Sequence, residues 1–506
     1  MKSRIAFPVG IAAGALALAG LAIGAVPTDT STLRAAVTVD GVRSHQWALQ
    51  LIADASSGTR LAGTIGHDES ASYVAEAAAA AGYDVTVQPF DFVKFEPLGP
   101  SVLEQTAPVP AVYVEDTDFN VMSQSEPGDV TGFVTAVDVV DIGLGNASTS
   151  GCEFSDFATF PTGHIALVQR GACTFQLKAE NAAAAGAIGA IIFNQGNSES
   201  RKGLINGTLG SGYSGGIPVF FATFDRGVEW LNTAGLELHM VANVNRETVT
   251  TFNVIAETPG GRDDRVVVVG AHLDSVPQGP GINDNGSGSA AQLEVALQMA
   301  ALGIEPRNKV RFAWWSAEES GLVGAQYYVD NLTRRGIKDI ALNLNFDMVG
   351  SPNFVRFVYD GDGSDTPLAG PNGSGNIEQV FLDHFAEQGL AAAPTAFSGR
   401  SDYGPFIAVG IPAGGLFTGA EGIKTEEEAA IYGGVAGEAY DPCYHLACDT
   451  YDNNSDEVLD QMADAIAHSV LTFAMTTSAV NGADKGSDKA MKAAASMEML
   501  GSHYRQ

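Results

Sequence analysis

AHLDSVPQGPGINDNGSGSAAQLEVA, residues 271–296, is the stretch that decides the fold of this chain. It follows four consecutive valines, Val266 to Val269, which predict a strand buried on both faces of a parallel sheet. His272 and Asp274 come at the carboxyl end of that strand, which is the edge where open α/β sheets bind ligands. Asp284 follows in a Gly/Asn-rich turn directly before a helix-like segment. This order of strand, polar loop and helix predicts an α/β domain with a doubly wound, mostly parallel sheet.

The same pattern of an apolar strand followed by acidic residues occurs twice more. Residues 309–315 (KVRFAWW) predict a strand that leads into Glu318 and Glu319, and residues 340–346 (IALNLNF) predict another that ends at Asp347. The two glutamates could simply begin a helix, where carboxylates interact favourably with the helix dipole. Asp347 has apolar neighbours on both sides, and a carboxylate in that setting needs a cation or hydrogen-bond donors to offset its desolvation. We therefore expect these carboxylates to meet at one edge of the sheet.

A further candidate lies far downstream, in residues 441–449 (DPCYHLACD). His445 lies between Cys443 and Cys448, in a short loop that a disulfide would stiffen. Two histidines and three carboxylates suit two borderline cations that share a bridging carboxylate, and the imidazoles favour zinc over calcium. The predicted ligand set is His272, Asp284, Glu319, Asp347 and His445.

Six blocks in order, HLDS, GINDNGSG, WWSAEESGLVGA, NFDMVGSPN, GRSDYGPF and CYHLACD, together resemble the secreted co-catalytic di-zinc aminopeptidases, a family of leucine aminopeptidase-like zinc exopeptidases. The resemblance covers most of residues 251–475, with a weaker start at residues 45–90. It implies the zinc exopeptidase fold and two Zn²⁺ ions per chain, with Asp284 as the bridging carboxylate. His272 and Asp347 would complete one zinc site, and Glu319 and His445 the other.

The resemblance also implies how the reaction proceeds. Glu318 would be the general base, Asp274 would orient His272, and Tyr444 would donate a hydrogen bond to the scissile carbonyl. The backbone at Arg400 would help to hold the free amine of the substrate. A hydroxide shared by the two zinc ions would then attack the peptide bond. The implied substrates are peptides or proteins with free N-termini, and the residue removed would be large and apolar, similar to leucine.

Three alternatives remain on the sequence. A carboxypeptidase or dipeptidase of a related branch would need arginines for the substrate carboxylate, but Arg400 is the only arginine in the motif blocks after Thr251. A receptor that kept the fold and lost its metals would lack ligands, whereas the whole predicted set and the base are present. A glutaminyl cyclase fits the two-metal set and the inserted domain less well.

The first residues predict export. Lys2 and Arg4 precede an apolar, alanine-rich run over residues 5–25, which indicates a secretory signal peptide at residues 1–25. Because the run nearly reaches the length of a bilayer span, an uncleaved anchor is the alternative. Signal cleavage would leave a secreted, extracellular or periplasmic protein without a stable membrane span. The net charge of −32 argues against nucleic acid and anionic membranes as partners.

Four cysteines in an exported chain predict two disulfides. The close spacings favour Cys152 with Cys173 and Cys443 with Cys448, because the other pairings would bridge separate domains.

The length of 506 residues predicts more than one domain. Residues 108–245 are β-rich, and their RGACTF block and IGAIIFN strand resemble the protease-associated domain. That resemblance implies a lid or substrate-access role without catalytic residues. The catalytic domain would then comprise residues 38–107 and 246–476, and residues 477–506 would form a mobile tail.

Overall fold

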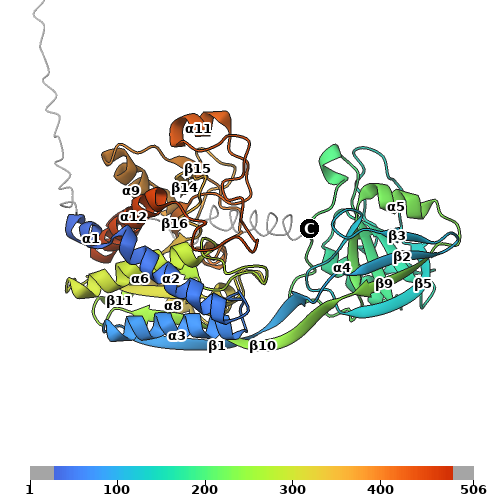
Figure 1. Ribbon diagram of the computed structural model, residues 1–506, viewed down its shortest axis with the longest axis horizontal. Helices are drawn as coiled ribbons and strands as arrows, with labels where there is room; N and C mark the ends of the chain where they lie inside the picture. Colours follow the sequence, from blue (N-terminus) through green and yellow to red (C-terminus); the bar gives the residue numbers. More distant parts are fainter. Residues whose placement is uncertain (1–27, 482–506) are drawn as a thin grey trace, which may run out of the picture.

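The computed structural model describes residues 28–481 and consists of two lobes joined by a long two-stranded ribbon (Figure 1). The ribbon is formed by β1 (Asp84–Pro97) and β10 (Val244–Glu257), which pair antiparallel over their whole length. Only the last residues of β10, from Val254, also pair with a strand of the large lobe. The chain therefore crosses between the lobes twice, in two strands that lie side by side. We call residues 98–243 the small lobe and the remainder of the described chain the large lobe, whose sheet includes the two strands of the ribbon.

The large lobe is built on an eight-stranded sheet in the order β1-β10-β12-β11-β13-β16-β14-β15. Its centre consists of four parallel strands, which bury apolar side chains on both faces. The outer strands β10 and β14 run antiparallel to their inner neighbours. The strands are β11 (Arg262–His272), β12 (Asn308–Trp315), β13 (Ile340–Phe346), β14 (Phe357–Tyr359), β15 (Ala393–Thr395) and β16 (Ala413–Phe417).

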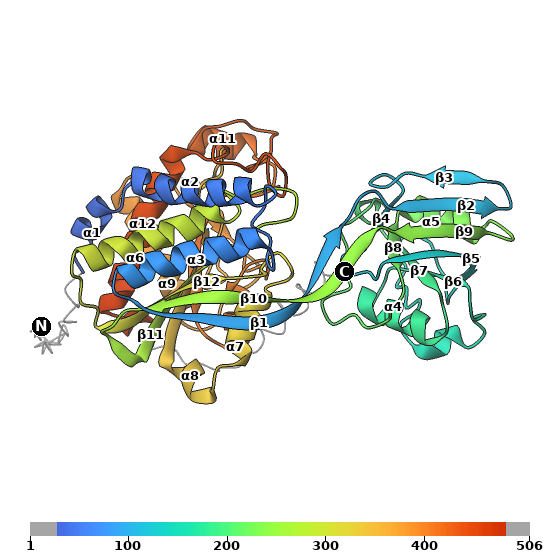
Figure 2. The same ribbon diagram turned by 60° about the horizontal axis from the view of Figure 1, so that its bottom comes forward.

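Helices cover both faces of this sheet, so the predicted doubly wound α/β fold is confirmed (Figure 2). One face packs against α1 (Ser31–Ala36), α2 (Val39–Ala55), α3 (Ile65–Ala80), α6 (Gly286–Ala301), α9 (Ser374–Glu387) and α12 (Asp456–Met475). The other face packs against α7 (Val323–Asp330), α8 (Arg334–Asp339) and α10 (Tyr403–Ala408). The short α11 (Glu426–Tyr432) has no buried residue.

The small lobe is an inserted, β-rich domain with a mixed sheet of eight strands in the order β3-β2-β9-β5-β6-β7-β8-β4. Its strands are β2 (Val102–Ala107), β3 (Ala111–Tyr113), β4 (Phe119–Val121), β5 (Gly128–Ala136), β6 (Ile165–Gln169), β7 (Gly189–Phe193), β8 (Val219–Ala222) and β9 (Glu237–Ala242). Its helices are α4 (Phe175–Ala184), α5 (Phe224–Leu231) and the short 3₁₀ turns η1 (Phe154–Phe157) and η2 (Glu199–Arg201). The chain enters this sheet before residue 107, where the sequence placed the boundary, because β2 already pairs with β9.

Both predicted disulfides are present. Cys152–Cys173 lies in the small lobe, and Cys443–Cys448 closes a loop of the large lobe.

The ends of the chain differ in how far they can be described. The expected signal peptide, residues 1–25, lies outside the described residues. Within residues 28–481, no helix has the length and apolar character needed to cross a bilayer. The tail expected from residue 477 starts with a helical turn, α13 (Ser478–Asn481), and Val480 is buried in the core next to α9. The last 25 residues lie outside the described part.

Candidate metal centre

The predicted ligands meet at the carboxyl edge of the central parallel strands. His272 is the last residue of β11, Glu319 follows the end of β12, and Asp347 follows β13. Because these strands run parallel, their ends lie at one edge of the sheet. The ribbon leaves the large lobe in the same direction, so this edge faces the small lobe (Figure 1).

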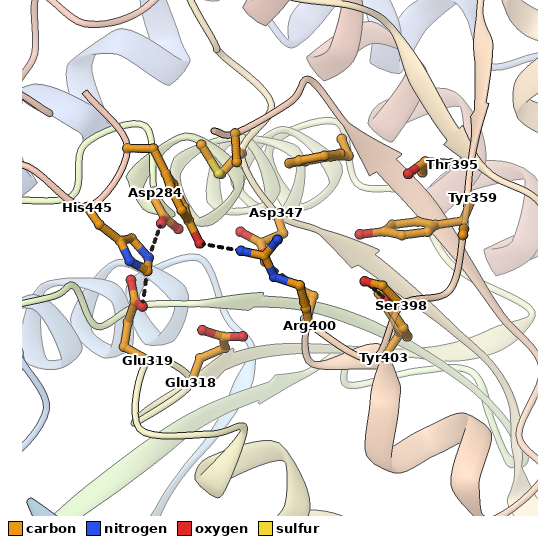
Figure 3. A pocket seen from close by; sticks show the side chains of 16 residues that line it. Asp284, Glu318, Glu319, Asp347, Tyr359, Thr395, Ser398, Arg400, Tyr403 and His445 are labelled. Atoms are coloured by element: carbon orange, nitrogen blue, oxygen red, sulfur yellow. Dashed lines mark hydrogen bonds and ion pairs between the residues drawn. The ribbon is translucent and has the colours of Figure 1, made fainter. Parts of the chain in front are cut away.

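Five side chains at this edge form two groups that share Asp284. In the first group, His272 Nε2 lies 3.2 Å from Asp284 Oδ1 and 3.2 Å from Asp347 Oδ1. In the second, His445 Nε2 lies 3.2 Å from Asp284 Oδ2 and 3.1 Å from Glu319 Oε2. Figure 3 shows Glu319, Asp284 and His445 pointing toward one another. Each oxygen of Asp284 thus faces a different histidine, as expected of a carboxylate that bridges two cations.

The buried carboxylates of the cluster make a positive charge between them favourable. Burial raises the pKa of Glu319, and its Oε1 has no hydrogen-bond partner among the described residues. Burial would also raise the pKa of Asp284, but hydrogen bonds from His272 and His445 hold that pKa below its ordinary value. Burial alone would lower the pKa of His445, whereas Glu319 and Asp284 raise it to about 11. The carboxylates therefore favour a cation at the imidazole, and a donor set of two imidazoles and three carboxylates in two triads fits two zinc ions.

Asp274 is completely buried next to His272, but it contacts the ring differently from the expectation. His272 Nδ1 lies 3.2 Å from the main-chain oxygen of Asp274 and 3.8 Å from its carboxylate. The carboxylate instead accepts hydrogen bonds from the backbone N–H groups of Glu318 (3.1 Å) and Glu319 (3.3 Å). Asp274 therefore links the end of β11 to the loop that carries both glutamates.

Two residues that the sequence analysis did not single out support the ligands. The Ser401 hydroxyl donates to Asp347 Oδ2 at 2.6 Å. The Asp449 carboxylate accepts from the backbone N–H groups of Asn283 (2.8 Å) and Asp284 (2.9 Å). Both residues lie inside the motif blocks GRSDYGPF and CYHLACD. The sequence therefore pointed to the right segments, but only the folded structure shows which side chain contacts which ligand.

Three non-glycine residues in the centre have left-handed backbone conformations. Ala317, directly before Glu318, has φ +56°, Met348 has φ +53°, and His445 itself has φ +58°. Such conformations cost about 1–3 kcal/mol each and persist where the surroundings impose them. Ala317, for instance, is fully buried in a cluster with Phe90 of the ribbon. The positions of the candidate ligands are thus set by packing from several elements.

Glu318 lies beside the two triads. Its Oε2 is 4.0 Å from His272 Nε2, and the side chain is about nine-tenths buried. Burial raises its pKa well above the ordinary value, and nearby carboxylates, first among them Asp402, add to that effect. The group is therefore placed to bind and release a proton close to the metal ligands.

A pocket of about 550 Å³, including its open mouth, leads to these residues. At the mouth, Arg400 donates to the Tyr444 hydroxyl at 3.1 Å and forms an ion pair with Glu421 at 2.7 Å. The Tyr444 ring stacks on His445, with 3.8 Å between ring centroids. The remaining wall is mainly apolar or aromatic and includes Met348, Tyr359, Ala396, Tyr403, Phe417 and Ala420.

Comparison with known proteins relates most of the chain to aminopeptidases. Residues 253–470 match the model of peptidase family M28, and residues 130–230 match the PA domain. The chain is 56% identical over 411 residues to an aminopeptidase of Pseudomonas aeruginosa, covering 81% of this chain and 76% of the relative. It is 41% identical over 400 residues to leucine aminopeptidase 2 of Arthroderma otae, covering 78% and 75%. Among solved structures, a zinc aminopeptidase from Bacillus subtilis has a TM-score of 0.57 and 28% identity, covering 86% of this chain and 94% of that protein.

Proposed function

Because this chain belongs to peptidase family M28, we propose that it is an exported aminopeptidase that uses two zinc ions to release large apolar N-terminal residues from peptides. The observation that carries the proposal is the pair of ligand triads that share Asp284. The names of the relatives, aminopeptidase and leucine aminopeptidase, support the reaction and the preference.

Two zinc ions fit the donor set. His272, Asp284 and Asp347 would hold one, and Asp284, Glu319 and His445 the other. Zinc ions bound there would lower the pKa of a water molecule and would polarise the scissile carbonyl group.

Glu318 would act as the general base. Its carboxylate is buried beside the triads and forms no ion pair with an arginine or lysine in the described chain, so it is free to accept the proton of the attacking water. The same group would then deliver that proton to the leaving amine. Asp274 would keep Glu318 in place through the hydrogen bond to its backbone N–H.

Tyr444 would stabilise the negative charge that develops on the carbonyl oxygen. Its hydroxyl oxygen accepts a hydrogen bond from Arg400, so its own O–H proton remains available for the substrate. The carboxylates of the centre would attract the N-terminal ammonium group. We retain the backbone of Arg400 as a candidate contact for that amine, because this residue lines the pocket.

The preference for leucine-like residues would come from the pocket wall. Met348 and Phe417 offer apolar surface, and Tyr359 stacks against a buried aromatic residue, Phe397. An apolar side chain of the substrate that packs against this wall removes the apolar surface of both from water, which favours binding.

We also propose that the small lobe, which faces the metal centre, limits access of large substrates. The two disulfides and the apolar start of the sequence support an oxidising, extracellular location. A periplasmic location would meet the same conditions.

The test is hydrolysis of leucyl peptides with free and with acetylated N-termini, before and after chelation and after zinc is added back. Metal-dependent release of leucine from the free amine alone is the expected result. Cleavage of the blocked peptide from its other end would indicate a carboxypeptidase. Absence of any hydrolysis by protein that carries two metal ions would overturn the proposal in favour of a binding protein.

A further inference from the structure

Arg60 is a completely buried cation to which the proposed reaction gives no role. It lies in the loop between α2 and α3, and its relative exposure is 0%. A buried guanidinium is costly unless its donors are satisfied, so its partners indicate what it does.

The side chain of Arg60 binds the loop between β11 and α6 at both ends. Nη1 donates to the carbonyl oxygen of Leu273, directly after the ligand His272. At the other end, Nε donates to the carbonyl of Pro280 at 2.8 Å and Nη2 to that of Gly281 at 2.5 Å. One rigid guanidinium thus fixes the main chain just after one candidate ligand and three residues before the bridging carboxylate.

The same loop is fastened a second time through the main chain of Arg60. Its backbone N–H donates to Ser275 Oγ at 2.9 Å, and that hydroxyl contacts the carbonyl of Gly279 at 3.0 Å. Gly281 has φ +60°, and a Cβ at this position would lie 2.3 Å from the Asp284 carbonyl oxygen and 3.2 Å from Nη2 of Arg60. The loop and the guanidinium are therefore packed so closely that position 281 has no room for a side chain.

The carboxylates near Arg60 favour its charged form, although their oxygens accept no hydrogen bond from its side chain in the described structure. Asp274, Asp449, Asp284 and Glu319 are close enough to oppose the effect of burial, which lowers the pKa of Arg60 to about 10. At neutral pH the side chain is still protonated. All three hydrogen bonds of its side chain in the described structure nevertheless go to carbonyl oxygens. An arginine paired directly with a ligand carboxylate would compete with a metal ion for the same lone pairs.

We propose that Arg60 is a positioning residue for the metal centre, which holds the main chain between His272 and Asp284 in the ligand-binding arrangement and leaves the carboxylate oxygens free. The inference rests on the proposed function for the identity of the metal. Lysine could keep the charge but could not replace the three-pronged contact, because its single ammonium group lacks the planar fork.

The experiment compares full-length Arg60→Lys and Arg60→Met with the wild type. Zinc content and the release of zinc to a chromophoric chelator are measured on folded protein. Both variants should bind zinc about 10- to 100-fold more weakly, the effect of losing a group that orients ligands. The matched control is Arg356→Lys, because Arg356 is also buried in the large lobe and donates to a carbonyl, that of Ala391, away from the pocket. This control should retain zinc like the wild type.

Amide hydrogen exchange of metal-free protein separates this inference from the proposed function. Peptides that span residues 273–286 should exchange faster in Arg60→Lys than in the wild type, whatever the wild type binds or hydrolyses. The inference would be overturned if Arg60→Lys retained zinc and exchanged amide hydrogens like the wild type. It would also be overturned if Arg60→Met bound zinc more tightly than the wild type, because Arg60 would then affect the metal only through its charge.

If neither arginine variant folds, Ser275→Ala provides the test, because it removes the main-chain link and leaves the guanidinium in place. It should show the same changes in smaller measure. Unchanged zinc release and unchanged exchange in that variant would contradict the inference.

Discussion

Asp284 is the residue on which the proposed two-metal site depends most. Its two oxygens face two different histidines, and it is the residue that both proposed ligand triads share. Replacement by alanine should therefore release both metal ions. Replacement of His445 should weaken mainly the group that contains Glu319. Atomic emission analysis of dialysed protein measures both outcomes, and Asp284→Ala that keeps two zinc ions would exclude a bridging role.

Glu318 should behave in the opposite way, because it lies beside the triads and is assigned a proton-transfer role. Glu318→Gln keeps the size of the side chain and removes the base. It should retain zinc and lower kcat by roughly 10²- to 10⁴-fold, the usual contribution of a general base. Steady-state kinetics with leucine p-nitroanilide, together with metal analysis of the same sample, tests this. A normal kcat would remove Glu318 from the mechanism.

At this scale the sequence led to the site because the candidate ligands follow strand ends. Parallel strands bring such positions together at one edge, so His272, Glu319 and Asp347 could be grouped without coordinates. Arg60 could not be found in the same way. It follows no predicted strand, and its contacts with the metal loop arise only when α2 and α3 pack onto α6.

Among the elements, those with a clear apolar pattern were the most predictable. The strand expected at residues 340–346 is β13, and the helix expected directly after Asp284 is α6, which begins at Gly286. Short elements had no usable pattern: β14 and β15 have three residues each, and they depend on β16 for their place in the sheet. The entry into the small-lobe sheet was placed too late because β2 is defined by its pairing with β9, not by its own sequence.

Helix α12 is joined to the beginning of the chain by a polar cluster. Arg34 of α1 forms two hydrogen bonds with Asp464, and His384 of α9 binds the same carboxylate. His468 stacks on His384 and contacts the Thr30 hydroxyl at 2.9 Å. The cluster thus fastens three helices together away from the metal ligands.

This cluster predicts a loss of stability in acid. Burial, with the charges of His384 and Arg34, lowers the pKa of His468 from 6.5 to about 4. A lowered folded-state pKa means that the unfolded chain binds the proton more readily. The contribution of His468 is therefore fully present above pH 6.5 and is lost as the pH falls toward 4.

Chemical denaturation of metal-free protein at pH 7 and at pH 4.5 measures this loss. His468→Gln keeps a hydrogen-bonding group and removes the titration, so its free energy of unfolding should fall less between the two pH values than that of the wild type. Equal losses in both proteins would show that His468 does not contribute.

At the scale of the whole molecule, the candidate metal site and most of its supporting contacts belong to the large lobe. A ligand that binds only the native state stabilises it by about 2.7 kcal/mol when its concentration is 100 times Kd. In scanning calorimetry, chelation should therefore lower the transition of the large lobe and leave that of the small lobe in place. A matched downward shift of every transition would mean that the two lobes unfold as one unit.

The ribbon of β1 and β10 has a consequence for how the molecule can be taken apart. Its last pair, Pro97 with Val244, brings the two ends of the small lobe next to each other. A two-residue Asn-Gly turn in place of residues 98–243 would convert the ribbon into an ordinary β-hairpin, since such turns match the twist of paired strands. The small lobe is in this sense a module inserted at the tip of a hairpin. A trimmed protein, or one with a different module inserted there, would keep every candidate metal ligand.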